Sequence, residues 1–403
     1  MSHASSSARA PISDLLRLHR DGRLDEAAAG YRRILDSRDP VDPVERQVAM
    51  ANLAAVEASS GRLDEAVDLY ERARSLAPDQ AGLAYNLGCV LARRGDHARA
   101  AEVLEGFLRA SPADFEGLLL AARSLRLSEQ PEAAAVRFRQ ALELRPEYAL
   151  GHRKLGNVLR DLGRNEQAIE AYRRGAALGD SISPHLAAAL SGDATERAPA
   201  EYVRTLFDHH ADAYDEILRS LGSRGHELLE RALSDLRVDW PVQRALDLGC
   251  GTGLGAPLLV DRCVELVGVD LSSRMLENAS HGGAYDALVE ADAVAFLHAR
   301  PSAHWDLIVA ADVVVYFGDL GELFDAAADG LAPGGHFVFT AERCDDAEHM
   351  LTRSGRYAHS ASYLRRVAHE VGLRVSSLSS ATLRLEAEQE VPGHLVVLTR
   401  PPA

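Results

Sequence analysis

Hydrophobic and small residues recur with a period of 34 positions through the first half of this 403-residue chain. Small anchor residues keep the period at Ala66, Ala100, Ala134 and Ala168. A large apolar or aromatic side chain follows four positions after each anchor, at Tyr70, Leu104, Phe138 and Tyr172. Proline keeps the same period at Pro78, Pro112 and Pro146. Because small residues let helices approach closely and proline ends a helix, each period predicts a pair of packed helices.

A looser unit precedes these four. The segment 22–35, GRLDEAAAGYRRIL, is nearly repeated at 61–74, and its anchor Ala27 lies 39 positions before Ala66 because of a short insertion. The pattern resembles the tetratricopeptide repeat (TPR). We therefore expect a disordered stretch at 1–10 and an all-helical TPR array of about five repeats at 11–180. The resemblance implies a concave surface that binds a protein or peptide partner, and a purely structural array is the alternative.

The hydrophobic pattern changes in the second half. Residues 181–200 are rich in small and polar residues and are expected to form a linker. Beyond them, short apolar runs alternate with amphipathic segments such as 273–279 and 320–331. Seven runs predict strands, at 244–250, 264–272, 286–292, within 305–317, and at 334–342, 374–386 and 394–400. This alternation predicts a doubly wound, Rossmann-like α/β fold over 201–403, with its last two strands antiparallel.

A glycine-rich turn follows the first expected strand. The segment 246–255 reads LDLGCGTGLG, which places Gly249, Gly251 and Gly253 where ligands bind at the carboxyl ends of parallel strands. Asp270 ends the second strand, where a carboxylate can accept hydrogen bonds from ribose hydroxyls. Two cofactors stay open at this point, because GTGLGA at 251–256 also fits the dinucleotide pattern G-x-G-x-x-A.

Two further carboxylates favour a cofactor with an ammonium group over NAD. Asp247 precedes the glycines, where it suits an ammonium group and would repel a pyrophosphate. Asp292 follows the third strand, where an adenine amino group could lie.

Residues of about 202–401 resemble the class I S-adenosylmethionine-dependent methyltransferases. The resemblance rests on LDLGCGTG at 246–253, LVGVDLSSRMLENA at 266–279, EADA at 290–293 and LAPGGHFVFT at 331–340. It implies S-adenosylmethionine as the cofactor and a seven-strand sheet with a terminal hairpin. The cofactor-binding residues are then Tyr214, Asp247, Gly249, Gly251, Gly253, Asp270, Leu271, Asp292, Ala293 and Asp312. The whole chain resembles a group of bacterial predicted methyltransferases with TPR repeats.

The segment 206–218, LFDHHADAYDEIL, resembles a helix that covers the cofactor in many class I members. Phe207, Ala211 and Tyr214 follow helical spacing and are expected to face inward, with Tyr214 against the methionine part of the cofactor. His209 and His210 are adjacent, so they point about 100° apart on a helix and cannot both serve one site. Either is a candidate base, and exposed histidines without a catalytic role are the alternative.

Candidate acceptor-side residues follow the fourth and fifth strands. Tyr316 joins Asp312 in the segment 310–319, AADVVVYFGD, which lacks the [N/D]-P-P-aromatic motif of methyltransferases acting on nucleic-acid bases or protein glutamine. Later, 353–364 contains Arg356, Tyr357 and His359, which predict either a substrate lid with an anion clamp or a surface loop. The candidate catalytic residues are therefore His209, His210, Tyr316 and His359.

Charge and composition exclude several classes of function. The net charge is −16, and nearly all of it belongs to residues 201–403, which carry 31 acidic and 17 basic side chains. Such an acidic domain is a poor nucleic-acid binder, so no nucleic-acid partner is expected. No apolar run approaches the ~20 residues of a membrane span. Four scattered cysteines argue against a zinc cluster, so no metal site is expected, and they suit a cytoplasmic protein.

Three functions fit these observations. The first is methyl transfer from S-adenosylmethionine to an unidentified acceptor, with the TPR array docking a protein substrate or partner. The second is a small-molecule methyltransferase whose repeats serve assembly. The third is a non-catalytic adaptor with a vestigial cofactor site, against which Asp247, Asp270 and the intact glycines speak.

Overall fold

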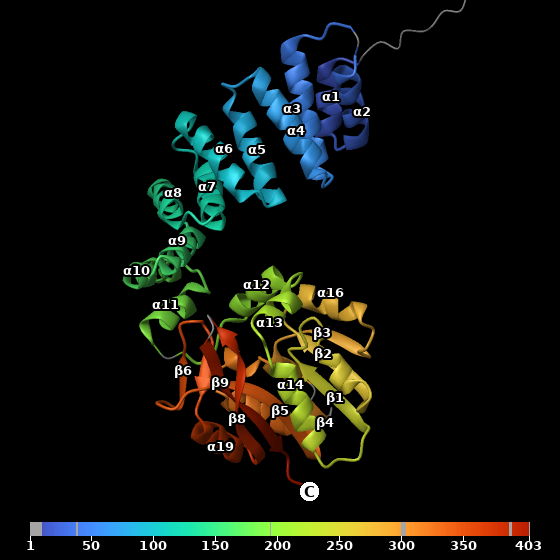
Figure 1. The fold of residues 1–403 in the computed structure, drawn as a ribbon, viewed down its shortest axis with the longest axis vertical. Helices are drawn as coiled ribbons and strands as arrows, with labels where there is room; N and C mark the ends of the chain where they lie inside the picture. The colour runs from blue at the N-terminus through green and yellow to red at the C-terminus, as the bar shows by residue number, and fades with distance from the viewer. Residues whose placement is uncertain (1–9, 38, 194, 300–303, 387–388, 403) are drawn as a thin grey trace, which may run out of the picture. The chain divides into compact units, whose positions relative to one another are not determined.

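The computed structural model describes residues 10–402 except 38, 194, 300–303 and 387–388. The chain divides into two compact units, Met1–Asp180 and Ser181–Ala403. Figure 1 shows the first as a stack of helices and the second as a twisted sheet with helices on it. The expectation of disorder at 1–10 lies, apart from Ala10, outside the described residues.

Unit 1 is all helical over its described residues. Its helices are α1 (Ile12–Arg20), α2 (Leu24–Leu35), α3 (Pro43–Ser59), α4 (Leu63–Leu76), α5 (Ala81–Arg94), α6 (His97–Ala110), α7 (Phe115–Leu127), α8 (Pro131–Leu144), α9 (Ala149–Asp161) and α10 (Asn165–Ala177). Each helix packs against the next one along the chain. The periodic prolines each fall two residues after the end of α4, α6 or α8, as a helix-ending residue should.

The periodic small residues lie where paired helices meet. All five anchors, Ala27, Ala66, Ala100, Ala134 and Ala168, have no exposed surface. At Gly156, an added Cβ would lie 2.5 Å from the buried ring of Tyr172, and at Gly88 it would lie 2.6 Å from Leu104. The 34-residue period of small residues in the sequence is therefore explained by close packing of the paired helices.

Unit 2 contains one mixed sheet. Its strands are β1 (Val242–Leu248), β2 (Cys263–Asp270), β3 (Ala287–Glu290), β4 (Trp305–Ala310), β5 (Leu331–Arg343), β6 (His349–Leu351), β7 (Tyr357–His359), β8 (Arg374–Glu386) and β9 (Gln389–Thr399). The parallel part runs β3-β2-β1-β4-β5, and β9 pairs antiparallel with both β5 and β8. This confirms the expected α/β class and its antiparallel last pair. The carboxyl ends of β1, β2, β3 and β4 consequently share one edge.

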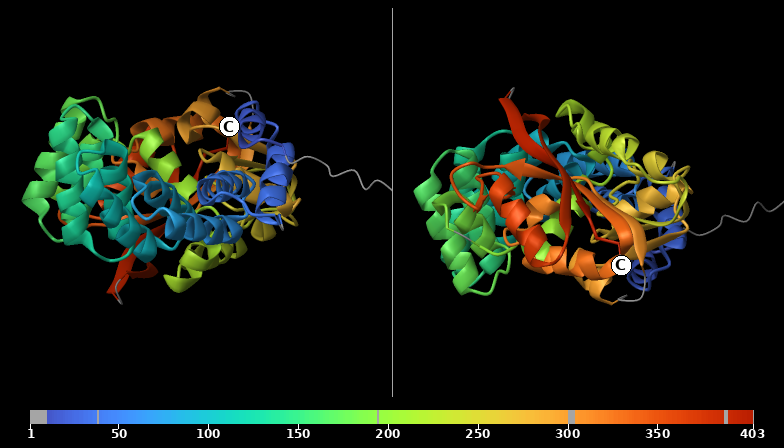
Figure 2. Two further views of the ribbon diagram at one scale, coloured as in Figure 1. Left: turned by 90° about the horizontal axis from the view of Figure 1, so that it is seen from above. Right: turned by 90° about the horizontal axis from the view of Figure 1, so that it is seen from below.

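Helices cover both faces of the sheet, as the views in Figure 2 illustrate. They are α11 (Ser183–Ser191), α12 (Ala200–His210), α13 (Tyr214–Ser220), α14 (Gly225–Asp235), α15 (Ala256–Leu259), α16 (Ser273–His281), α17 (Ala293–His298), α18 (Gly321–Gly330) and α19 (Ala361–Glu370). One core contains Phe324, Phe337 and Phe339, and a second packs Leu229 and Leu233 of α14 against the sheet. Among the described residues, no helix is long and apolar enough to cross a membrane.

Three segments differ from what their sequences indicated. Residues 181–200, expected as a linker, contain α11, whose Ala188 and Ala189 join the core of unit 2. The segment 353–364 was predicted to be either a substrate lid or a surface loop. It contains the buried strand β7, which pairs with β6 and with the end of β5. The expected single helix at 206–218 is two helices, α12 and α13, because the chain turns at 211–213.

Candidate functional site

Two adjoining cavities open at the carboxyl edge of the parallel strands. The larger, of about 680 Å³, is lined by Asp270, Leu271, Asp292 and Ala293, among others. The smaller, of about 510 Å³, is lined by Asp247 and the glycine turn. Both include Tyr214, Gly249, Gly251, Ala311 and Asp312, so they form one continuous site.

The glycine turn between β1 and α15 needs glycine for two reasons. Gly249, Gly251 and Gly253 have φ values of 73°, 54° and 88°, a region that side chains disfavour. An added Cβ at Gly249 would also lie 2.2 Å from Val313, and one at Gly255 would lie 2.9 Å from an oxygen of Asp247. The bare backbone therefore lets Val313 and Asp247 pack directly against the turn.

Asp270 stands at the end of β2 in the larger cavity. Its Oδ2 accepts the N–H of Gly251 at 3.0 Å, and its Oδ1 accepts the N–H of Ser272 at 2.9 Å. Burial raises the pKa of this carboxyl group, while these hydrogen bonds favour its ionised form. The side chain is thus held in one orientation beside the glycine turn.

Asp292 begins α17 and is engaged on both oxygens. Oδ1 accepts the N–H groups of Val294 and Ala295, and Oδ2 pairs with Arg197. Arg197 itself lines the larger cavity and carried no signal in the sequence. Its ion pair with Asp292 therefore joins two residues of the cavity lining.

Asp247 is buried beneath the glycine turn and lines the smaller cavity. The Tyr285 hydroxyl donates to its Oδ2 at 2.7 Å. Burial raises the pKa of Asp247 to about 6. Cys250, in the turn itself, is also buried, and burial raises the pKa of its thiol.

Helices α12 and α13 bring aromatic rings to the site. Phe207 and Tyr214 both line the larger cavity, with ring centroids 5.7 Å apart. Ala211, at the turn between the helices, is buried. The Thr252 hydroxyl in the glycine turn donates to Asp215 Oδ1 of α13 at 2.6 Å. The aromatic segment is therefore attached directly to the turn that it covers.

The same segment is also attached to α16. Arg274 donates to both carboxylate oxygens of Asp212 at 2.7 Å, and Asn278 donates to the carbonyl of Ala211 at 2.8 Å. His209 is exposed, and neither it nor its neighbour His210 lines either cavity. The structure thus brings Tyr214 to the site and leaves both histidines outside the linings.

Asp312 and Tyr316 follow β4. Asp312 lines both cavities, has a φ of 54° that is unusual for a residue with a side chain, and donates its N–H to Thr340 Oγ1. Tyr316 lines the larger cavity, and burial raises the pKa of its hydroxyl to about 12. Tyr316 therefore meets a ligand as a neutral hydroxyl that can donate a hydrogen bond.

His359 does not line either cavity. It has no exposed surface, and its Nε2 donates to the backbone carbonyls of Phe317 and Gly318 at 2.8 and 3.2 Å. Its ring stacks on Tyr363. These contacts assign it to the packing of β7.

One histidine that the sequence reading missed does line the smaller cavity. His226 stands in the first turn of α14 and lies near enough to Asp312 and Asp215 for their charges to oppose the lowering of its pKa by burial. No motif marks this position, because the fold alone brings α14 to the end of β4.

Unit 1 carries a separate hollow of about 1040 Å³. It lies across α8, α9 and α10 and is lined by Arg139, Leu142, Glu143, His152, Leu155, Leu159, Gln167, Glu170, Ala171 and Arg174. Charged side chains of both signs therefore border an apolar floor.

Two family models match the chain. Residues 203–383 match the methyltransferase domain, and residues 51–115 and 119–181 match the tetratricopeptide repeat. Together with the strand order and the glycine turn, this identifies unit 2 as a methyltransferase domain and unit 1 as a TPR array.

Similar curated proteins cover part of unit 2. A trans-aconitate 2-methyltransferase of Rhizobium leguminosarum is 36% identical over 110 residues, which are 26% of this chain and 42% of that protein. Its counterpart from Azoarcus is 35% identical over 129 residues, or 30% and 50% of the two chains. Nodulation protein S of Rhizobium tropici is 31% identical over 109 residues, or 26% and 44%. The chain thus spans half or less of the length of these relatives.

Solved structures of TPR proteins resemble part of the chain. MamA of Desulfovibrio magneticus is 23% identical with a TM-score of 0.38, covering 42% of this chain and 97% of that one. YrrB, described as a TPR protein with an unusual peptide-binding site, is 20% identical with a TM-score of 0.39, covering 42% and 84%. Likeness at this level supports no statement about function.

Proposed function

We propose that unit 2 transfers a methyl group from S-adenosylmethionine to an acceptor at the continuous site. The observation that carries this proposal is the set of three carboxylates, Asp247, Asp270 and Asp292, at the ends of three adjacent strands beside a bare glycine turn. The cofactor offers an ammonium group, ribose hydroxyls and an adenine amino group to such carboxylates.

Each lining residue has a role in holding the cofactor. Asp270 would accept hydrogen bonds from the ribose hydroxyls, and Asp247 would face the ammonium group. Leu271 and Ala293 provide apolar surface for the adenine ring. Bound S-adenosylmethionine supplies a methyl group on a positively charged sulfur, so the protein has mainly to align it with the acceptor and exclude water. Phe207 and Tyr214 are placed to exclude that water.

The carboxylates also speak against a dinucleotide. Asp247 lies under the turn that would face a pyrophosphate, and the side chain that donates to it is the neutral Tyr285 hydroxyl rather than a cation. An anion beside the ionised carboxylate would be repelled, whereas a cation would be attracted.

Titration calorimetry with S-adenosylmethionine tests the cofactor. We expect binding by the intact protein, a loss of at least tenfold in affinity in Asp270→Asn, and no change in Asp235→Asn, a matched exposed carboxylate at the end of α14. NAD binding in place of S-adenosylmethionine would overturn the proposal. Equal affinity of the two variants for S-adenosylmethionine would show that Asp270 does not contribute to cofactor binding.

The acceptor has two candidates. The hollow on α8–α10 favours a protein acceptor docked by the repeats. The names of the relatives favour a small carboxylic acid. To separate them, labelled methyl groups from the cofactor would be followed into protein and into small molecules, using the full chain and its Arg139→Glu/Arg174→Glu variant. Loss of protein labelling in the variant supports docking, whereas unchanged labelling of trans-aconitate supports the small molecule.

A further inference from the structure

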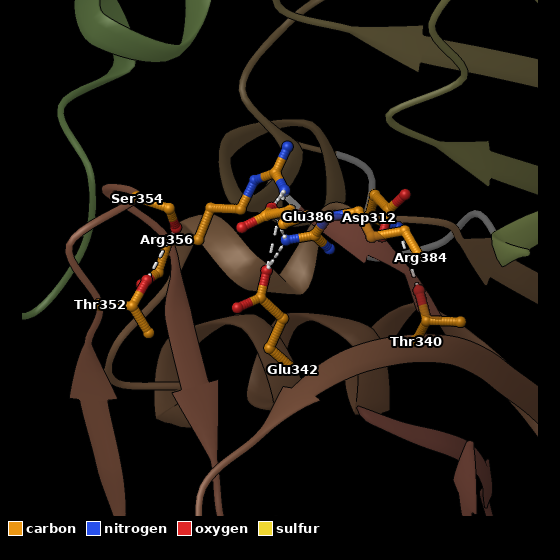
Figure 3. Close-up of polar contacts among 8 residues, drawn as sticks. All are labelled: Asp312, Thr340, Glu342, Thr352, Ser354, Arg356, Arg384 and Glu386. Carbon is orange, nitrogen blue, oxygen red and sulfur yellow. Dashed lines mark hydrogen bonds and ion pairs between the residues drawn. The ribbon is translucent and has the colours of Figure 1, made fainter. Parts of the chain in front are cut away.

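Four charged side chains form a cluster where β5, β8 and the residue before β7 meet (Figure 3). They are Glu342 on β5, Arg356 before β7, and Arg384 and Glu386 on β8. Arg384 contacts Glu342 at 2.5 Å and Glu386 at 2.7 Å. Arg356 contacts Glu386 at 3.2 Å and approaches Glu342 only to 3.8 Å.

The two arginines of this cluster are not equivalent. The side chain of Arg384 is 3% exposed and that of Arg356 is 27% exposed. Arg384 already neutralises the buried Glu342 at hydrogen-bonding distance, so this carboxylate does not depend on Arg356 for a partner. The nearer contact of Arg356, Glu386, is itself 41% exposed. Arg356 is therefore held in a defined position, but no buried carboxylate needs its charge for neutralisation.

Arg356 also lies beside the wall of the site. Its guanidinium is close enough to Tyr316, Tyr214 and Asp312, which line the larger cavity, for its charge to interact with theirs. Figure 3 shows the guanidinium with one edge turned to Glu342 and Glu386. A guanidinium has five N–H donors, more than these contacts require.

We propose that Arg356 and Tyr316 form a subsite for a carboxylate group of the methyl acceptor. This inference rests on the proposed methyl transfer and names the class of its acceptor, a small di- or tricarboxylic acid. The planar guanidinium matches a carboxylate in two parallel hydrogen bonds, and the Tyr316 hydroxyl adds a third donor.

Carboxylate methylation also agrees with the positions of the histidines. A carboxylate oxygen of the acceptor attacks the methyl carbon, the C–O bond forms, and the S–C bond breaks with its electron pair passing to sulfur. The products are a methyl ester and neutral S-adenosylhomocysteine. No proton is released, so the step needs no general base. His209, His210 and His359 can therefore lie outside the cavity linings, and His226, which lines the smaller cavity, is not needed as a base.

Calorimetry on the full chain saturated with S-adenosylhomocysteine tests the subsite. The probes are trans-aconitate, citrate and succinate, with trans-aconitate triamide as the uncharged control. We expect at least one acid to bind, its affinity to fall tenfold or more in Arg356→Gln, and part of it to return in Arg356→Lys. Arg353→Gln, an exposed arginine three residues earlier, should bind like the intact protein. Turnover should show the loss in KM rather than in kcat.

The outcomes separate the two proposals. If S-adenosylhomocysteine and S-adenosylmethionine fail to bind the intact protein, the methyl transfer itself fails, and the subsite with it. If the cofactor binds but none of the three acids does, or the triamide binds equally well, the carboxylate subsite alone is overturned. Equal acid binding by Arg356→Gln and the intact protein also overturns it. Cofactor affinity measured in every variant reports whether the domain has folded.

Discussion

At the scale of single residues, the partners of Asp247 and Asp270 indicate which ligand groups each carboxylate can bind. Asp247 receives one hydroxyl donor, and no cation among the described residues forms an ion pair with it, so its charge is costly until a cationic ligand arrives. Asp270 is oriented by two backbone N–H groups. The site is thus arranged for a ligand that brings positive charge to one carboxylate and hydroxyl groups to the other.

The raised pKa of Asp247 predicts pH-dependent cofactor affinity. With a pKa of about 6, the carboxylate forms between pH 5 and pH 7, while the ammonium group of the cofactor keeps its charge. Affinity for S-adenosylmethionine should therefore rise, by up to about tenfold, over this interval. Calorimetry at several pH values would show this rise in the intact protein and a flat profile in Asp247→Asn. Identical slopes in both proteins would contradict the assignment.

The same shift has the opposite sign for the stability of the free protein. The folded pKa of Asp247 lies above its ordinary 3.8, so the unfolded chain loses the proton first. The contribution to the free energy of unfolding is full below pH 3.8 and is lost as the pH rises through about 6. Cofactor binding thus becomes strongest where this carboxylate stabilises the empty fold least.

Residues within short motifs could be found from the sequence, whereas partners distant along the chain could not. Asp247, Asp270 and the glycines were recognisable because their spacing follows one strand, one turn and the next strand. Arg197 and His226 were not, because only the tertiary fold carries them to the cavities. The cluster around Arg356 joins three separate segments, and its charge pairing depends on the antiparallel hairpin.

At the scale of elements, the α12–α13 segment is joined to the glycine turn by a hydrogen bond between two side chains. Thr252→Val removes the bond to Asp215 and keeps the shape of the side chain. We expect cofactor affinity to fall about tenfold or more, mainly through faster dissociation, because a hydrogen bond to a charged group contributes about 1.5–3 kcal/mol and 1.4 kcal/mol corresponds to a factor of ten. Stopped-flow dissociation would measure it. Thr205→Val, exposed on α12, is the control, and an equal change there would rule out a specific attachment.

Helix pairs in the TPR array depend on missing side chains. Gly156→Ala would place a Cβ 2.5 Å from the buried Tyr172, so we expect unit 1 to lose about 1–3 kcal/mol of stability. Gly106→Ala, in α6, meets only the flexible end of Arg109 at 3.4 Å and should be neutral or stabilising, because alanine favours helix. Urea unfolding of both variants decides the matter. Equal stability of the two variants would contradict the explanation that the 34-residue period arises from close helix packing.

Long elements with recurring apolar positions were predictable, and short elements defined by their neighbours were not. Residues 374–386 form β8 over the full expected range. By contrast, β6 and β7 have three residues each and exist as strands through pairing with each other and with the end of β5. Helix α11 was missed for a similar reason. Its alanine-rich sequence is typical of a linker, and only the folded structure shows that these alanines pack into the core of unit 2.

At the scale of the whole molecule, the continuous site is built entirely from residues of Ser181–Ala403. A protein limited to 181–403 should therefore bind S-adenosylmethionine within twofold of the full chain, as measured by calorimetry. Starting it at 195 instead removes α11 and should lower the melting temperature, since buried apolar surface is lost. Loss of cofactor binding on removing 1–180 would show that the repeats contribute to the site.

The buried thiol in the glycine turn gives the protein an internal reporter. Cys250 is almost fully buried and lines the smaller cavity, and its raised pKa keeps it protonated, so it should react slowly with an alkylating reagent that enters the cavity. A ligand that occupies the cavity would close that route. The rate of alkylation at Cys250, measured with and without a candidate ligand, would therefore report how accessible the cavity is and whether the ligand occupies it. This measurement does not require the acceptor to be known.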